Sequence, residues 1–322
     1  MNNMKIRYGI VGTGHIGNYH TQQIQKIDDV ILKGIYDINF TQAKKIAAKN
    51  NTLAYKSLDD LLSVCDAISI ATPAFSHFEI AMAGIKKNCH LFIEKPLTTS
   101  ISNAERIIHE AKLKNLFIQV GHIERFNPVF LAFIEKNESC NPLFIEAHRL
   151  TPFNLRGTDV DVILDLMIHD IDLMLCLVKD SIKQISATGV KILTQSIDLA
   201  NARIEFTNGC VANLTASRIS IKQMRKLRVF EKKYYSSLDL QNYKLDCFTI
   251  RKTISKGENL NDSIVHLDSK TIPPGNALYQ ELVSFINSIQ HSGYISVGAL
   301  EGKKAIQVAL QIQQKINEKC QQ

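Results

Sequence analysis

The sequence has no apolar run long enough to cross a membrane, because no stretch reaches about 18 consecutive apolar residues. Its seven cysteines are an odd number, lie far apart and include no Cys-x-x-Cys pair. A disulfide framework is therefore excluded, and a zinc site is not expected. Internal repeats and low-complexity linkers are also absent. Because residues 1–3 lead almost directly into an apolar strand, we expect no signal peptide and a cytoplasmic protein without membrane contact.

The net charge of +7 invites comparison with proteins that bind nucleic acids. The densest basic stretch, Lys222 to Lys233, alternates like a β-strand, and Val229 to Tyr234 predicts a hairpin turn between two strands. A solvated sheet face accounts for this pattern, and a modest positive field also suits an anionic small-molecule substrate. We therefore expect no nucleic-acid partner.

Length and hydrophobic periodicity predict an α/β protein with two domains. The 322 residues, 45% of them apolar, can bury one large core or two medium ones. Up to about residue 120, apolar strands alternate with amphipathic helices, which predicts a doubly wound parallel sheet. From residue 121 onward, helices stand among longer alternating strands, which predicts an α+β domain with a large, mostly antiparallel open sheet. The predicted domains are thus 1–120 and 121–322.

The individual elements follow from the same periodicity. The predicted strands are Ile6–Val11, Val30–Tyr36, Ala67–Ala71, Leu91–Ile93, Phe117–Val120, Leu143–Leu150, Ile185–Leu193, Leu199–Phe206, Val211–Ser220, Leu227–Phe230, Ser236–Leu240 and Cys247–Lys252. The predicted helices begin at Ile16 or cover Thr41–Asn50, Phe78–Lys87, Ser102–Lys114, Asn127–Glu135, Val162–Leu177, Ala277–Gln290 and Leu300–Lys319.

A glycine-rich turn follows the first predicted strand. Gly12, Gly14 and Gly17 have the G-x-G-x-x-G spacing at the junction of a strand and a helix. In this motif the first glycine permits a tight turn, the second lets the backbone approach a pyrophosphate, and the third lets the helix pack on the strand. The helix N-terminus then offers N–H groups to the phosphates. We therefore expect residues 1–120 to form a dinucleotide-binding Rossmann domain.

Asp37 directly follows the second predicted strand, about where such domains hold the ribose hydroxyls. A carboxylate there accepts hydrogen bonds from the 2′- and 3′-hydroxyls and repels a 2′-phosphate. Neither Arg nor Lys occurs in residues 38–41. The sequence therefore predicts NAD rather than NADP as the cofactor.

Polar residues follow two further strands, where ligands of open α/β sheets bind. Ala71 to His77 follow one strand, and Glu94 to Leu97 follow the next. Lys95 precedes a proline that ends its strand. A lysine held inside a cleft can donate to a substrate oxygen, or accept its proton if burial lowers its pKa. We expect the chemistry where the two domains meet.

The whole chain resembles the glucose-fructose oxidoreductase and inositol dehydrogenase family, also called Gfo/Idh/MocA. The resemblance rests on the glycine motif, Ala71-Thr72-Pro73 with His77, Glu94-Lys95-Pro96, and Asp165-x-x-x-His169, in this order. It implies a dehydrogenase with Lys95, Asp165 and His169 beside the substrate and the nicotinamide. The implied cofactor contacts are Gly12, Thr13, Gly14, His15, Ile16, Gly17, Asp37, Ala71, Thr72, Pro73, His77, Glu94 and Lys95.

The spacing of Asp165 and His169 is consistent with these roles. Residues i and i+4 share one helix face, so the acid can orient and support the imidazole. The alternative is a helix N-terminal acid followed by a satisfied core histidine. Asp170 and Asp172 flank His169, but their spacing places them on different faces, so we expect no metal.

A closer resemblance, over Gly121–Pro128, Arg149–Arg156 and Asp159–Leu173, points to the branch that oxidises the 3-hydroxyl of UDP-N-acetylglucosamine for a transaminase that makes a 3-amino sugar, as in lipid A. Contacts to a diphosphate or to sugar hydroxyls are expected from Arg125, Asn127, Arg149 and Arg156, with salt bridges as the alternative. Asp161 stands where this branch is expected to have glycine.

The resemblance implies that the sugar carbinol carbon gives a hydride to nicotinamide while His169 or Lys95 takes the hydroxyl proton. The sequence leaves open which of the two is the base. Residues 121–322 would then bind the substrate and form a homodimer or homotetramer through the open sheet. Two alternatives remain: oxidation of another sugar or cyclitol, and a non-catalytic NAD-binding regulator of the same fold.

Overall fold

The computed structural model describes residues 5–137, 140–154, 160–250, 264–291 and 293–320. Internal contacts divide the chain into two compact units. The first unit comprises Met1–Phe126 and Asn276–Ile306, and the second comprises Asn127–Gly275 and Gln307–Gln322. Each unit is described by itself.

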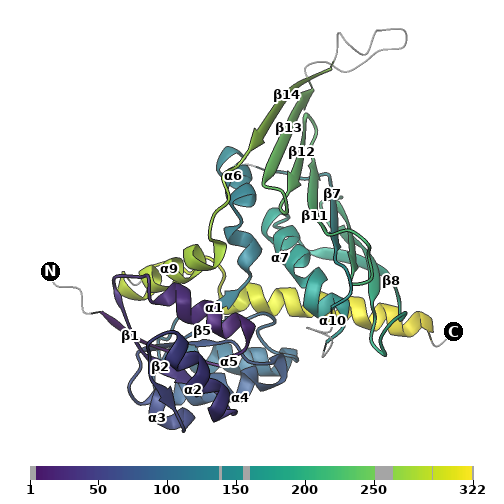
Figure 1. Cartoon of the computed structure of the whole chain (residues 1–322). Coiled ribbons are helices and arrows are strands. Elements are labelled where there is room, and N and C mark those ends of the chain that lie inside the picture. The colour runs from purple at the N-terminus through teal and green to yellow at the C-terminus, as the bar shows by residue number, and fades with distance from the viewer. Residues whose placement is uncertain (1–4, 138–139, 155–159, 251–263, 292, 321–322) are drawn as a thin grey trace, which may run out of the picture. The chain divides into compact units, whose positions relative to one another are not determined.

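The first unit is built on a six-stranded parallel sheet (Figure 1). The strand order β3-β2-β1-β4-β5-β6 is that of a dinucleotide-binding Rossmann sheet. Its strands are β1 (Ile6–Val11), β2 (Val30–Tyr36), β3 (Ala54–Tyr55), β4 (Ala67–Ile70), β5 (His90–Glu94) and β6 (Ile118–Gly121). The connecting helices are α1 (His15–Ile24), α2 (Phe40–Lys49), α3 (Leu58–Leu62), η1 (Ala74–Ser76), α4 (His77–Lys86) and α5 (Ile101–Leu113), and η2 (Ile123–Phe126) follows β6. The predicted parallel sheet is confirmed.

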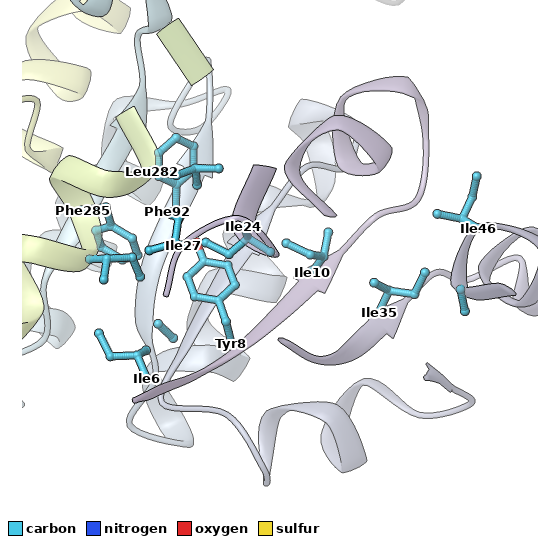
Figure 2. Close-up of a cluster of buried hydrophobic side chains, with 13 residues drawn as sticks. Ile6, Tyr8, Ile10, Ile24, Ile27, Ile35, Ile46, Phe92, Leu282 and Phe285 are labelled. Atoms are coloured by element: carbon cyan, nitrogen blue, oxygen red, sulfur yellow. The ribbon is translucent and has the colours of Figure 1, made fainter. Parts of the chain in front are cut away.

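One face of this sheet is covered by α1, α2 and α9 (Ala277–Gln290). Side chains of β1 alternate between the two faces, and Ile6, Tyr8 and Ile10 point to one face (Figure 2). They share a buried cluster with apolar residues from each of the three helices: Ile24 from α1, Ile46 and Ala47 from α2, and Leu282, Phe285 and Ile286 from α9. The opposite face is covered in part by α3, since a Cβ at Gly9 would meet Leu61 and Cys65.

Helix α9 therefore belongs to the core of the first unit, although it lies far along the chain. The ring of Phe285 packs edge-on against Tyr8 and Phe92, with centroids 6.5 Å and 5.9 Å away. The two units thus differ from a single division of the chain at residue 120. That substrate binding and oligomerisation reside in 121–322 stays a prediction.

The second unit contains an eight-stranded mixed sheet (Figure 1). Its order is β14-β13-β12-β11-β7-β10-β9-β8, and all neighbours are antiparallel except β7 and β10. The strands are β7 (Phe144–Leu150), β8 (Ile182–Val190), β9 (Leu199–Phe206), β10 (Val211–Ser217), β11 (Met224–Phe230), β12 (Tyr234–Asp239), β13 (Lys244–Ile250) and β14 (Ile264–Thr271). The helices are α6 (Pro128–Lys136), the π-helical turn η3 (Ile163–Met167) and α7 (Ile168–Leu177), and α10 (Ala299–Cys320) contributes residues to both units. The predicted, mostly antiparallel sheet is confirmed.

The two faces of this second sheet differ in character. One face is buried and carries small or branched residues, such as Ala212, Leu214 and Ala216 of β10, where η3 and α7 pack. The other face carries an aromatic row from β7, β11, β12 and β13, with successive ring centroids 5.7, 4.6 and 5.0 Å apart: Phe144, Phe230, Tyr235 and Phe248.

The predicted basic strand and turn at residues 222–234 contain the whole of β11, the turn after it and the first residue of β12. Arg228 pairs with Glu146 at 2.6 Å, and Lys226 lies 3.7 Å from Asp239. These basic side chains therefore have acidic partners on the same sheet. None of the helices in the described ranges combines the length and the apolar character needed to cross a bilayer.

The packing of α9 predicts a large loss of stability when Phe285 is truncated. Phe285→Ala should lower the free energy of unfolding by about 3–5 kcal/mol, because the buried ring leaves a cavity between α9 and the sheet. The change is measured by urea denaturation. Tyr294→Ala, which removes an 83% exposed ring from the same unit, is the control and should cost less than about 0.5 kcal/mol. Equal losses in the two variants would show that α9 adds nothing to this core.

Candidate functional site

The three glycines after β1 differ in what a side chain at each position would contact. Gly12 has φ +94°, and a Cβ there would lie 2.6 Å from the Ala71 carbonyl oxygen. A Cβ on Gly17 would lie 1.9 Å from the carbonyl oxygen of Gly12, so α1 can reach β1 only without it. Around Gly14, by contrast, a Cβ would meet nothing within 4 Å. The fold itself requires the first and third glycines, whereas the second leaves open space for a ligand to approach the backbone.

The N-terminus of α1 suits an anion. Gly14 is its N-cap without a side-chain hydrogen bond, and no acidic residue occupies the first turn. His15 and Ile16 are exposed there. Free N–H groups and the helix dipole at such an end favour a phosphate.

Asp37 is fixed at the end of β2 by the glycine turn. Its Oδ2 accepts hydrogen bonds from the backbone N–H of Thr13 at 2.7 Å and from the Thr13 hydroxyl at 2.9 Å, and its Oδ1 accepts one from Asn39 N–H at 2.9 Å. The carboxylate is half-buried. Thr13 is 1% exposed, so its side chain orients Asp37. Together the turn, the helix end and the placed acid fit a dinucleotide.

His77 ties together the segments after β4 and β5. Its Nδ1 lies 2.8 Å from the Pro96 carbonyl oxygen and its Nε2 2.9 Å from that of Thr72. The ring is buried, and burial lowers the pKa of His77, against the opposing effect of the two carbonyl oxygens. Thr72 also accepts a hydrogen bond from Ser76 Oγ at 2.8 Å. His77 therefore positions these two segments, while Pro73 lies exposed between them.

Glu94 ends β5, and Lys95, half-buried, follows it. Glu94 Oε1 accepts a hydrogen bond from Nε2 of the fully buried His20, 2.8 Å away. Burial by itself raises the pKa of the Glu94 carboxyl, but the hydrogen bond from His20 and the nearby positive charges outweigh it, so this pKa lies below its usual value. The first unit thus brings the glycine turn, Asp37, His77 and Glu94 to the carboxyl ends of its parallel strands.

In the second unit, Asp165 and His169 lie on either side of a change in helix type. Asp165 is in the π-helical turn η3, and His169 is in the first turn of α7. Both are half-buried. The predicted helix at 162–177 therefore begins with a π turn, a feature often found at functional sites. Its wider turn means that i, i+4 spacing alone does not fix how the two residues face each other.

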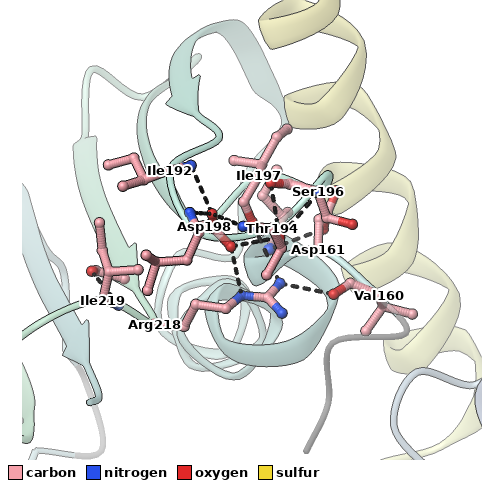
Figure 3. Close-up of polar contacts among 12 residues, drawn as sticks. Val160, Asp161, Ile192, Thr194, Ser196, Ile197, Asp198, Arg218 and Ile219 are labelled. Atoms are coloured by element: carbon pink, nitrogen blue, oxygen red, sulfur yellow. Dashed lines mark hydrogen bonds and ion pairs between the residues drawn. The ribbon is translucent and has the colours of Figure 1, made fainter. Parts of the chain in front are cut away.

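Buried polar contacts hold the start of this helix (Figure 3). Asp198, 0% exposed, accepts hydrogen bonds from three successive backbone N–H groups, those of Ile192, Leu193 and Thr194, at 2.7, 2.7 and 2.9 Å. Arg218 lies 3.7 Å from Asp198 and donates to the Val160 carbonyl oxygen at 2.8 Å. The loop before β9 and Val160, three residues before the start of η3, are therefore joined through Arg218 and its buried ion pair with Asp198.

Asp161 has a structural role of its own. Its Oδ1 accepts hydrogen bonds from the N–H groups of Ile163 and Leu164, at 3.0 and 3.1 Å, and its Oδ2 accepts one from Gln313 at 2.6 Å. It thus caps η3 and ties it to α10. This accounts for an aspartate at the position where glycine was expected.

The predicted substrate contacts differ in their surroundings. Arg149 forms a buried, two-pronged ion pair with Asp170, with distances of 3.0 and 2.8 Å. Asn127 is also buried; it caps α6 through Val129 N–H and donates to the Leu240 carbonyl oxygen. Arg125, in η2, is half-buried. Arg156 lies outside the described residues.

Sequence reasoning missed the groups that orient these residues. One such group is a row of hydrogen bonds that runs from Glu94 to His20, Ser69 and Tyr8. The other is the ion pair of Asp198 and Arg218 near the start of η3. One signal was present: His20 follows Gly17 by three residues, one turn further along α1. In the described ranges, no group of three or more His, Cys, Asp or Glu side chains is arranged to hold a metal ion.

Comparisons with known proteins agree with this geometry. Residues 6–122 match the model of the oxidoreductase family with an NAD-binding Rossmann fold. Residues 146–233 match the GFO/IDH/MocA C-terminal domain. Both the predicted family and the predicted NAD-binding domain are confirmed.

Similar individual proteins are dehydrogenases. The chain is 34% identical over 308 residues to UDP-N-acetylglucosamine 3-dehydrogenase of Acidithiobacillus ferrooxidans, covering 95% of this chain and 96% of that protein. A solved structure of that enzyme superposes with a TM-score of 0.89 at 32% identity, covering 97% of this chain and 98% of the other. Myo-inositol 2-dehydrogenase of Thermotoga maritima is 25% identical over 67% of this chain and 70% of its own. The apo scyllo-inositol dehydrogenase of Lactobacillus casei shares the fold, with a TM-score of 0.81 at 20% identity, over 99% of this chain and 98% of its own.

The family therefore follows from motifs, sheet topology and sequence similarity together. The glycine turn, the 3-2-1-4-5-6 strand order and the mixed second sheet all belong to one pattern, and it extends over nearly the whole chain. The chain belongs to the Gfo/Idh/MocA oxidoreductase family, with an NAD-binding Rossmann domain.

Proposed function

We propose that this protein oxidises the 3-hydroxyl of UDP-N-acetylglucosamine with NAD. The observation that carries the proposal is the 34% identity over 95% of the chain to an enzyme of that name. The ketone formed is an electrophile that a transaminase can convert to a 3-amino sugar. The proposed setting is cytoplasmic synthesis of a glycan such as lipid A.

The residues of the first unit would bind and orient the cofactor. Gly14 and the α1 N-terminus would receive the pyrophosphate. Asp37, held by Thr13, would accept hydrogen bonds from the adenosine ribose hydroxyls and disfavour a 2′-phosphate. The segment of Ala71 to Pro73, fixed by His77, would line the same ligand. When bound, nicotinamide supplies an acceptor for the hydride of the carbinol carbon.

We propose that Lys95, Asp165 and His169 serve the proton transfer. His169 or Lys95 would take the proton of the substrate hydroxyl, Asp165 would orient His169, and Lys95 would also stabilise charge that develops on the oxygen. The support for these roles is the family resemblance and the π turn that sets Asp165 apart from regular helix. Arg149 and Asn127 already have partners inside the second unit, so any contact with the sugar nucleotide would compete with those pairs.

A homodimer or homotetramer is part of the proposal. Its support is the aromatic row on the open face of the second sheet, formed by Phe144, Phe230, Tyr235 and Phe248. Half-buried aromatic rings of this kind are common in protein interfaces.

The first prediction concerns the cofactor. NAD should bind about tenfold or more tightly than NADP, a difference of about 1.4 kcal/mol, measured by calorimetry. Asp37→Asn removes the charge but keeps an acceptor for Thr13, and it should reduce the ratio of NAD affinity to NADP affinity. Asp37→Ala should reduce this ratio too. Asp59→Asn, an equal change of charge at an exposed site of the same unit, should leave the preference unchanged. Equal or tighter NADP binding by the unmodified protein would remove Asp37 from this role.

The second prediction concerns catalysis. Lys95→Met and His169→Ala should each lower kcat by about a hundredfold or more, the usual contribution of a positioned acid or base. The affinity for NAD should change little. Lys112→Met and His109→Ala, both exposed on α5, are the matched controls and should keep full activity. A variant at position 95 or 169 that retains near-normal turnover identifies that residue as structural.

The third prediction concerns the substrate. Oxidation of a secondary alcohol by NAD is unfavourable near neutral pH, so little ketone should accumulate with UDP-N-acetylglucosamine alone. A 3-keto-sugar transaminase with glutamate should pull the reaction forward and give a UDP-linked 3-amino sugar, detected by mass spectrometry. If this product is absent while a cyclitol or another sugar is oxidised readily, the substrate proposal fails and the family assignment stands. Tight NAD binding without turnover of any sugar would instead indicate a non-catalytic regulator.

A further inference from the structure

A buried row of polar groups crosses the core of the first unit and ends at Glu94. The Tyr8 hydroxyl lies 2.8 Å from Ser69 Oγ, Ser69 Oγ lies 3.0 Å from His20 Nδ1, and His20 Nε2 lies 2.8 Å from Glu94 Oε1. Tyr8, Ser69 and His20 are each 0% exposed. We call these four residues the Tyr8–Glu94 network. Polar groups buried to this degree are costly unless they are hydrogen-bonded.

The hydrogen bonds of the Tyr8–Glu94 network run in one direction. An ionised carboxylate only accepts, so His20 Nε2 donates to Glu94. A neutral imidazole then accepts at Nδ1, so Ser69 donates to His20 and Tyr8 donates to Ser69. Burial raises the pKa of Tyr8 and keeps its hydroxyl protonated. The opposite direction would leave the Tyr8 O–H without an acceptor, because Ser69 is its hydrogen-bond partner among the described residues.

The rings around the Tyr8–Glu94 network restrain it further. Phe92 packs edge-on against His20, with centroids 5.1 Å apart, and against Phe285. Gly121 lies under the carboxylate of Glu94, because a Cβ there would be 2.9 Å from Oε2. The imidazole and the carboxylate are thus held by apolar packing as well as by hydrogen bonds.

Only one oxygen of Glu94 is used by this arrangement. Oε1 accepts from His20, and the described residues make no hydrogen bond to Oε2. The side chain is 18% exposed, at the carboxyl end of β5, where ligands of such sheets bind. An ionised carboxylate oxygen in this position can accept a hydrogen bond from a ligand hydroxyl.

We propose that His20, backed by Ser69 and Tyr8, is a positioning residue that aims Glu94 Oε2 at a hydroxyl of the bound dinucleotide. The proposal rests on the assignment of Glu94 to the cofactor site. It assigns a function to a histidine that has no exposed surface.

The test is a double-mutant cycle on NAD affinity, measured by calorimetry at pH 7.5. His20→Leu should weaken NAD binding about tenfold, a change of about 1.4 kcal/mol. His20→Gln offers an N–H in place of Nε2–H and should recover most of the affinity. Glu94→Gln should weaken binding to a similar degree, and adding His20→Leu to it should cause little further loss.

Upstream variants should give a graded result. Ser69→Ala should weaken binding less than His20→Leu, and Tyr8→Phe less again, because each is one hydrogen bond further from Glu94. His90→Gln is the matched control: His90 lies at the opposite end of β5 and accepts a hydrogen bond from Phe117 N–H. It should leave NAD affinity unchanged. Thermal melting separates loss of folding from loss of affinity.

The pH dependence gives a second readout that a purely structural histidine would not alter. Glu94 is faced by His20 on α1, His77 on α4 and Lys95 beside it. Without His20, only Lys95 and His77 oppose the effect of burial, so the pKa of Glu94 rises relative to that in the unmodified protein. NAD binding uses the ionised Glu94 carboxylate, so affinity falls as the pH is lowered through the pKa of Glu94. In His20→Leu this fall should begin at a higher pH than in the unmodified protein, and in His20→Gln it should begin at the same pH as in the unmodified protein.

The outcomes separate this proposal from the proposed reaction. Additive losses in the cycle, or an unchanged pH dependence in His20→Leu, overturn the role of His20 even if sugar oxidation is intact. Coupled losses with the expected shift support it even if UDP-N-acetylglucosamine is not oxidised.

Discussion

The close approach of α1 to β1 is the constraint on which the first unit depends. It exists because Gly17 has no side chain, since a Cβ would lie 1.9 Å from the Gly12 carbonyl oxygen. This approach brings the helix N-terminus and Gly14 to the carboxyl ends of the strands. One turn later it places His20 where its ring reaches both Ser69 on β4 and Glu94 on β5. The same contact therefore shapes the dinucleotide turn and orders an acid two strands away.

The second unit depends on buried charge in a comparable way. Arg149 with Asp170 joins β7 to α7, and Arg218 with Asp198 joins the end of β10 to the loop before β9. Buried ion pairs add little net stability, because desolvation opposes the attraction, but losing one partner is costly. Such pairs penalise alternative packings of η3 and α7. That property suits the catalytic roles that we propose for Asp165 and His169 in this segment.

Much of this fold could be predicted from the sequence, because the relevant signals are local. The alternation in Ile6–Val11 and the helical periodicity in Ala277–Gln290 gave the bounds of β1 and α9 without error. The two-residue strand β3, the short helix α3 and the strand β14 were missed, since short or largely polar segments carry little periodicity. The packing of α9 on the first sheet could not be predicted, because only tertiary structure shows which side chains fill the space beside Tyr8.

The candidate site, like the fold, has features that local sequence predicts and features that it does not. Gly12, Gly14, Gly17 and Asp37 form a motif whose spacing carries its own physical reason, and the structure gives each a matching environment. The π turn at Asp165 has no such local pattern. The contact of Asp161 with Gln313 and the ion pair of Arg149 with Asp170 have none either, because each joins residues that are distant in the sequence. A conspicuous arginine is thus a weak indication of a ligand contact, since a buried acid such as Asp170 can already hold it. A hydrogen-bonded histidine with no exposed surface can, by contrast, bear on function through the one acid that it orients.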